Sequence, residues 1–117
     1  MIRTHKDLDV WKKSIEFVTY VYGITKTFPK EEIYGLTTQI RRSAVSIPSN
    51  IAEGATRKNK TEFKQFLYIA LSSAAELDTH FVISSNLGYI TEEQRIVILN
   101  DLGCISRMLQ GLIKSIS

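Results

Sequence analysis

The feature that most constrains the fold is a spacing, because apolar residues recur three and four positions apart through four successive stretches of the chain. The clearest run, with intervals of 4-3-4-3-4, is Phe63, Leu67, Ala70, Ala74, Leu77 and Phe81. Such spacing places apolar side chains on one face of an α-helix, whereas a half-buried strand needs alternation at every second residue. No segment alternates convincingly in that way, so the sequence predicts an all-α fold.

Four helices with short connections are expected, near residues 8–28, 36–54, 60–87 and 92–116. Lengths and connections of this kind favour an antiparallel up-down-up-down four-helix bundle, and residues 1–117 suffice for one such domain. Two capping signals agree with these bounds, since Asn59 with Glu62 and Thr91 with Gln94 are each typical of the first turn of a helix.

The predicted helices carry more apolar surface than one bundle needs. The first has two apolar stripes about 130° apart. The stripe assigned to the core is Leu8, Trp11, Ile15, Val18 and Tyr22, and the second stripe is Val10, Phe17, Val21, Ile24 and Phe28. Because large exposed apolar patches are uncommon on soluble monomers, we expect self-association through the surplus residues. The predicted interface residues are Val10, Phe17, Val21, Ile24, Ile69 and Ile83. The alternative is that wide helices pack deeply within one small bundle.

Positive charge is concentrated in the middle of the chain. Between positions 41 and 64 six bases stand against Glu53 and Glu62, which gives +4, while the remainder carries −1. The six bases are Arg41, Arg42, Arg57, Lys58, Lys60 and Lys64. Guanidinium forks and ammonium groups suit phosphate oxygens, so these residues are candidates for backbone-directed nucleic-acid binding. A solvated charged turn is the alternative reading.

The second predicted helix contains four residues expected to set its shape. Pro48 removes a backbone donor, so we expect a kink rather than a break, with Asn50 satisfying the carbonyl groups that Pro48 frees. Gly54 is available to cap the end of this helix, and Glu53 could pair with another helix or subunit.

No arrangement typical of an enzyme is found in the sequence. Glu76 and His80 are the nearest approach to a metal site and are too few, and Cys104 has neither a partner cysteine nor an adjacent histidine. We therefore expect no catalytic residues, metal, cofactor or small-molecule substrate. A single cysteine, with no apolar leader and no run of about eighteen apolar residues, favours a cytoplasmic protein that does not meet a membrane.

Several short motifs carry a resemblance to a known family. Residues 7–11, 28–36 and 39–54 resemble the bacterial four-helix-bundle family of 23S rRNA intervening-sequence proteins, and the match extends over about three quarters of the chain. The resemblance implies a cytoplasmic homopentamer of antiparallel four-helix bundles. Some members are encoded inside insertions in ribosomal RNA genes, and a related branch serves as the accessory protein of diversity-generating retroelements. Arg41 and Arg42 match the paired arginines of the family.

Charge, surplus apolar surface and resemblance together lead to one expected function. We expect a non-enzymatic, homo-oligomeric bundle that binds RNA or a ribonucleoprotein through its basic surface. The alternative is a protein-binding scaffold or accessory subunit whose basic turn contacts an acidic protein partner, with no direct nucleic-acid role.

Overall fold

The computed structural model describes residues 4–116, and within them it contains four long helices and no strand. They are α1 (Asp9–Thr25), α2 (Leu36–Ala55), α3 (Lys60–Asn86) and α4 (Glu92–Ile116). Two short 3-10 turns accompany them, η1 (His5–Asp7) before α1 and η2 (Lys30–Glu32) before α2. The predicted all-helical fold is confirmed. The bounds of α2, α3 and α4 lie within one residue of those expected, whereas α1 ends three residues early.

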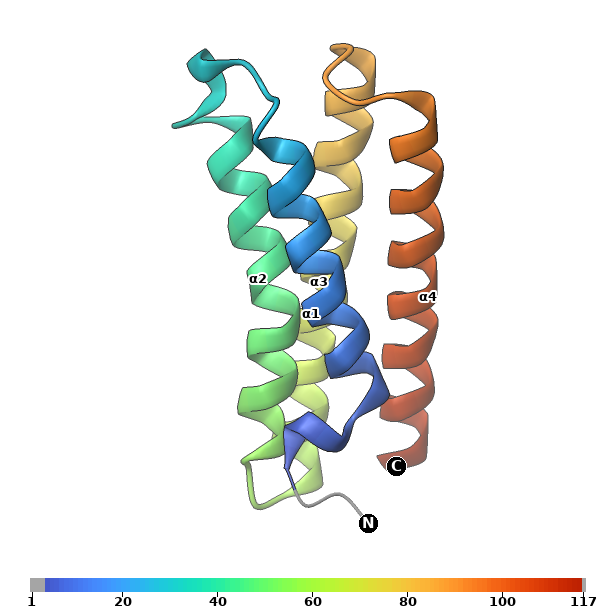
Figure 1. The fold of residues 1–117 in the computed structure, drawn as a ribbon. Coiled ribbons are helices and arrows are strands. Elements are labelled where there is room, and N and C mark those ends of the chain that lie inside the picture. The colour runs from blue at the N-terminus through green and yellow to red at the C-terminus, as the bar shows by residue number, and fades with distance from the viewer. Residues whose placement is uncertain (1–3, 117) are drawn as a thin grey trace.

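The four helices lie side by side along one long axis, and the chain reverses direction at each connection (Figure 1). The molecule measures 43 × 25 × 19 Å. One end, here called the α2–α3 end, holds the connection of residues 56–59 together with the start of α1 and the last turn of α4 (Figure 1). The opposite end, the η2 end, holds η2 and the connection of residues 87–91.

The core forms from one apolar stripe on each helix. In α2, α3 and α4 the buried residues follow the predicted stripes, for example Ile47 at 1%, Leu77 at 0% and Ile105 at 0% exposure. Burying each such aliphatic side chain contributes about 1.5–3 kcal/mol to folding. The prediction is therefore confirmed for these three helices.

In α1 the two apolar stripes are exchanged relative to the prediction. Val10, Phe17, Val21 and Ile24 were expected to face another copy, but they are 4%, 2%, 0% and 7% exposed and belong to the core. They cannot line an interface between intact copies, so that part of the prediction is wrong. Conversely, the stripe assigned to the core is turned partly outward: Leu8 is buried, and Trp11 and Val18 are half-buried against the core, whereas Ile15 and Tyr22 are each 39% exposed.

Two hydroxyl side chains explain why α1 can bury the stripe that it does. Ser14 and Thr25 lie among the buried residues of α1. Their Oγ atoms donate to the backbone oxygens of Val10 at 2.7 Å and Val21 at 2.8 Å. Because these bonds stay within the helix, the hydroxyls are satisfied without water, and the face that contains them can pack into the core.

The second helix runs through Pro48 without interruption. The carbonyl that Pro48 leaves without its usual donor belongs to Ala44, four residues earlier. Asn50 does not reach it, because its Nδ2 donates instead to the backbone oxygen of Ser46 at 2.8 Å and to Ser46 Oγ at 2.9 Å. The expected role of Asn50 is thus corrected, since it reinforces the turn after Ala44.

The η2 end is tied together by one carboxylate. Glu32 Oε1 accepts from the backbone nitrogen of Leu36 at the start of α2, while Oε2 accepts from Tyr89 Oη at 2.9 Å. This bond raises the pKa of the Tyr89 hydroxyl above its ordinary value, because ionised Tyr89 would lose the bond and face a carboxylate. Phe28 packs against the Tyr89 ring, with centroids 5.3 Å apart. The two connections at this end therefore hold each other.

Much apolar surface stays outside the core on the last two helices. By length and composition alone α3 and α4 could each cross a membrane, with mean hydropathies of 1.2 and 1.4 over their most apolar windows. Only 28% of each window is buried inside the bundle. Since both helices also line the core, the remainder of each window is apolar surface on the outside of the bundle.

Candidate nucleic-acid interface

The α2–α3 end is built on a close approach of two helices at Gly54. A Cβ atom at this position would lie 2.8 Å from Phe66 Cβ and 3.0 Å from Phe63 Cδ1. Gly54 does not cap α2, which continues to Ala55 and ends in Thr56, whose Oγ1 donates to the Glu53 oxygen at 2.7 Å. The expected capping role of Gly54 is therefore wrong. The glycine instead lets α2 and α3 touch, and this contact permits the short connection.

Basic side chains cluster around that connection. Asn59 starts α3 by accepting from the Glu62 backbone nitrogen at 2.8 Å, as its sequence spacing predicted. Arg57, Lys58 and Lys60 are exposed on either side of Asn59. Lys64 lies one turn further along α3 and is half-buried. These four of the six predicted bases share one end of the molecule.

Arg57 is held in place rather than free in solvent. Its guanidinium carbon lies 4.8 Å from the centroid of the Phe66 ring, which is a cation–π contact. Its Nη2 lies 4.0 Å from Glu53 Oε2, the outer limit for an ion pair, and the Arg57 side chain stays 42% exposed. An ion pair this long and exposed contributes little, so Arg57 keeps a positive charge available to an anion.

The other two predicted bases are not brought to this end. Arg41 and Arg42 lie fifteen or more residues earlier on α2, about 24 Å along the axis from Arg57 at 1.5 Å per residue. Arg41 Nε donates to Thr25 Oγ1 at 2.9 Å, and its guanidinium lies 4.6 Å from the centroid of the Tyr22 ring. Arg42 is exposed on α2, one turn before Ser46, whose hydroxyl bonds that of Ser73 on α3. The basic zone is thus continuous in sequence but divided in space.

The two ends of the bundle carry opposite charge. From residue 53 to residue 64, four bases stand against Glu53 and Glu62, a net charge of +2. The η2 end carries Lys26, Lys30 and Arg95 against four acids, a net charge of −1. These acids are Glu31, Glu32, Glu92 and Glu93. The α2–α3 end is therefore the more positive of the two.

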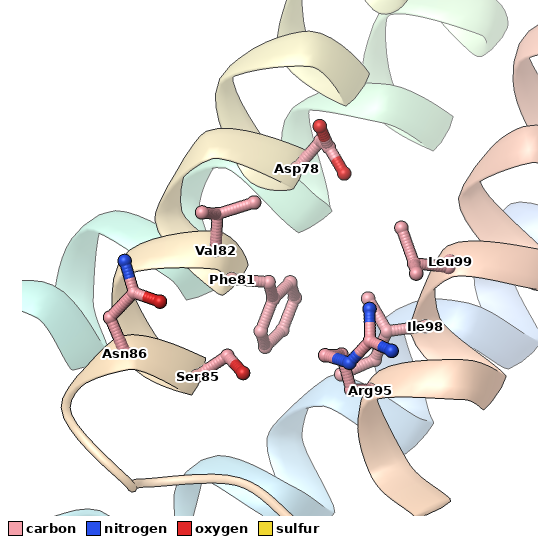
Figure 2. A pocket seen from close by; sticks show the side chains of 8 residues that line it. All are labelled: Asp78, Phe81, Val82, Ser85, Asn86, Arg95, Ile98 and Leu99. Carbon is pink, nitrogen blue, oxygen red and sulfur yellow. The ribbon is translucent and has the colours of Figure 1, made fainter. Parts of the chain in front are cut away.

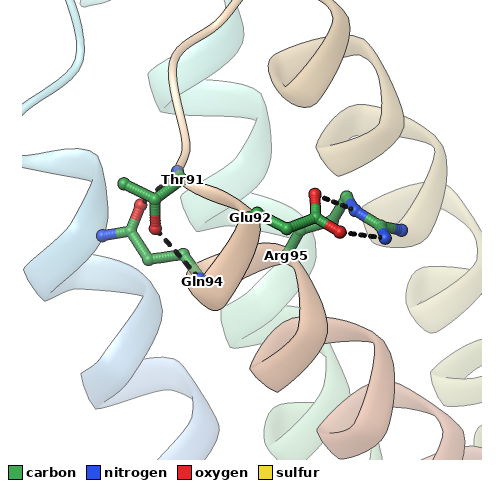
Figure 3. Close-up of polar contacts among 4 residues, drawn as sticks. All are labelled: Thr91, Glu92, Gln94 and Arg95. Carbon is green, nitrogen blue, oxygen red and sulfur yellow. Dashed lines mark hydrogen bonds and ion pairs between the residues drawn. The ribbon is translucent and has the colours of Figure 1, made fainter.

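At the η2 end, moreover, the cation of Arg95 is already matched. Figure 3 shows the start of α4, where Thr91 and Gln94 bond each other's backbone in a complete capping box, at 2.9 and 3.1 Å. Beside it Arg95 donates to both carboxylate oxygens of Glu92, at 2.6 and 3.0 Å. These bonds lower the pKa of Glu92 and raise that of Arg95. The pair presents little net charge to a ligand.

The residues considered for enzymatic chemistry are engaged elsewhere or stand alone. Glu76 accepts from Ser43 Oγ across the α2–α3 contact, instead of pairing with His80. Cys104 is half-buried, with Sγ 3.8 Å from Met108 Sδ. Across residues 4–116, no three of the side chains of His, Cys, Asp and Glu come together to hold a metal ion.

A set of hollows between α3 and α4 was not foreseen from the sequence. The one nearest the η2 end has a volume of about 280 Å³. Figure 2 shows Phe81 at its floor, with Asp78 and Val82 on the α3 side and Leu99 and Arg95 on the α4 side. The exposed apolar residues Val82 and Leu99 are the signal that a wider search of the helix faces could have used.

The fold and charge distribution define a class of protein, the compact four-helix bundle with one basic end. Comparison with known families is more specific, since residues 6–111 match the model of the 23S rRNA-intervening sequence proteins. The chain belongs to that family.

A solved structure agrees with this assignment. A protein of unknown function from the S23 ribosomal protein family of Bacteroides thetaiotaomicron is 32% identical, and the match covers 90% of this chain and 98% of that one, with a TM-score of 0.83. No curated protein matches the chain.

Proposed function

We propose that this protein is a non-enzymatic, homo-oligomeric bundle that binds RNA or a ribonucleoprotein by phosphate contacts at its α2–α3 end. The observation that carries the proposal is the cluster of Arg57, Lys58, Lys60 and Lys64 around a four-residue connection. Arginine supplies a planar fork for phosphate oxygens, and lysine supplies a mobile point charge. The family name, which refers to ribosomal RNA, agrees with this partner.

Assembly strengthens this binding. Residues 53–64 of one copy carry a net charge of only +2, which is modest for a polyanion-binding surface. Each further copy in a symmetric assembly adds the same charge, because every protomer presents the same end. A homopentamer, as the family resemblance implies, is the assembly we propose. The exposed apolar surface of α3 and α4 supports self-association.

A salt titration with a charge-reversed variant tests the RNA proposal. Phosphate binding predicts that the logarithm of affinity falls linearly with the logarithm of salt concentration. In the triple variant Arg57→Glu, Lys58→Glu and Lys60→Glu, we expect this slope to fall by about 2–3 for each bound copy, because each lost phosphate contact removes about 0.7–0.9.

The matched control reverses three exposed bases elsewhere, Lys26, Lys30 and Arg107, and therefore changes the net charge equally. It should retain most of the affinity. Equal loss in both variants would mean that total charge, not the α2–α3 end, governs binding. No binding of RNA by the wild type at low salt would refute the proposal and leave an acidic protein as the partner for this surface.

A further inference from the structure

Two apolar faces of the bundle lie on opposite sides. The four helices pack as a square, in which α1 contacts α2 and α4, and α3 contacts α2 and α4. Arg41 of α2 bonds Thr25 of α1, Ser43 of α2 bonds Glu76 of α3, and Lys13 of α1 pairs with Asp101 of α4 at 3.1 Å. The groove between α1 and α2 therefore points away from the groove between α3 and α4. Within residues 4–116, His5 of η1 contacts the first groove at Trp11, with ring centroids 5.2 Å apart.

The first of these, the α1–α2 face, is defined by Trp11, Ile15, Val18, Tyr22 and Val45. Ile15, Tyr22 and Val45 are each 39% exposed. A shallow hollow of about 300 Å³ runs between Trp11 and Val45. At the Tyr22 end the face carries the cation of Arg41, stacked on the Tyr22 ring.

The second, the α3–α4 face, is defined by Ala75, Asp78, Val82, Leu99 and Gly103. Val82 and Leu99 are 50% and 43% exposed. Three hollows of about 280, 360 and 430 Å³ follow one another along it. The small residues Ala75 and Gly103 line the middle one, which leaves room for a side chain from outside. No ion partner of Asp78 lies within residues 4–116.

The charges on the two faces lie at matching heights along the bundle. Ser43 and Glu76 are in contact, and α2 and α3 run in opposite directions. Arg41 lies two residues before Ser43, and Asp78 lies two residues after Glu76. Arg41 and Asp78 are therefore at nearly the same level, on opposite faces. A second copy placed beside the first with its axis parallel would bring the cation of one to the carboxylate of the other.

We infer that the α1–α2 face of one copy docks on the α3–α4 face of a second copy, with Arg41 of the first beside Asp78 of the second. The inference rests on the self-association in the proposed function and names the surfaces that perform it. Contact between two different faces is heterologous, and such contacts generate closed rings when the rotation between copies closes and open filaments when it does not. This pairing leaves a third surface outside the interface. That surface is the α2–α3 side, the long flank of the bundle where Ile69 and Ile83 lie exposed.

Complementation between two variants tests this pairing. Val45→Glu places a charge on the α1–α2 face, and Leu99→Glu places one on the α3–α4 face. Both positions are already part-exposed helix surface, so each variant should fold. We expect each alone to have the mass of one chain, 13.3 kDa, by light scattering at micromolar concentration. Mixed in equal amounts they should double that mass, because each retains the face that the other has lost.

The control is Ile69→Glu, at a position 47% exposed on the α2–α3 side, which should assemble like the wild type. Asp78→Arg should weaken assembly, and adding Arg41→Asp should restore it. A wild type that assembles while the mixture stays monomeric, or an Ile69→Glu variant that disperses, would overturn the pairing but leave self-association intact. A monomeric wild type would refute self-association itself, and binding of that monomer to lipid vesicles would identify a membrane as the occupant of these faces.

Discussion

Replacing Gly54 by alanine tests whether the helix contact at the α2–α3 end is as tight as the structure shows. The added methyl would meet Phe66 Cβ at 2.8 Å and the Phe63 backbone oxygen at 3.2 Å. Neither atom is the free end of a flexible side chain, so the helices must move apart to accommodate it. Overpacking of this kind costs about 1–3 kcal/mol. Against it stands a gain of about 1 kcal/mol, because alanine is the better helix former.

The two terms leave a net loss of about 0–2 kcal/mol, and the short 2.8 Å approach favours the steric term, so we expect Gly54→Ala to lower the free energy of unfolding by up to about 2 kcal/mol. For a chain of 117 residues this corresponds to a fall in Tm of up to about 8 °C. Thermal unfolding followed by circular dichroism measures it, with all variants at one protein concentration because association also shifts Tm.

Gly23→Ala is the matched control for this substitution. Gly23 also lies inside a helix, but an added Cβ would have nothing within 4 Å. Only the propensity term then operates, and Tm should rise by about 4 °C. The two substitutions are chemically identical and should have opposite signs. If Gly54→Ala stabilised the protein as Gly23→Ala does, the close approach of α2 and α3 would be refuted.

Two further predictions concern polar contacts between elements. The neutral Tyr89 hydroxyl donates to Glu32, and this bond raises the pKa of Tyr89, so the stability that the bond contributes is complete below pH 10 and is lost as pH rises through the folded-state pKa. Urea titrations should therefore show the free energies of unfolding of wild type and Tyr89→Phe converging at high pH. Free energies that stay equally far apart at every pH would contradict the bond. Lys13→Met removes the 3.1 Å pair with Asp101, which is partly exposed, so it should cost at most about 1 kcal/mol at low salt and less at high salt.

The sequence predicted the core of three helices but could not choose between two stripes on the first. Both stripes of α1 have the same three-and-four spacing, so periodicity alone treats them equally. Chemistry offered a signal that spacing did not. The outward stripe holds Trp11 and Tyr22, aromatic residues with a polar atom, which often stay partly in water. The buried stripe holds Ser14, whose hydroxyl can be satisfied by its own helix.

Only part of the candidate site was predicted correctly, because residues that are close in sequence are not always close in space. Residues 57–64 surround one turn, and so their closeness in sequence became closeness in space. Arg41 and Arg42 are separated from them by most of a rigid helix, and a local charge count ignores that length. The hollows between α3 and α4 depend on how far apart two helices sit, and a stripe of apolar residues does not specify that distance.

The positions at which α1 begins and α4 ends have a practical consequence for any binding study. Both lie at the same end of the bundle as the connection that carries Arg57 and Lys58 (Figure 1). An affinity tag fused to either terminus would therefore be attached at the end of the bundle whose binding is being assayed. In a symmetric assembly every copy would place its tag at that same end. A polyhistidine tag would add imidazoles there, while an acidic epitope tag would compete with RNA for the same bases. Protein from which the tag has been cleaved, or a tag inserted in the connection between α3 and α4, leaves the α2–α3 end free for binding.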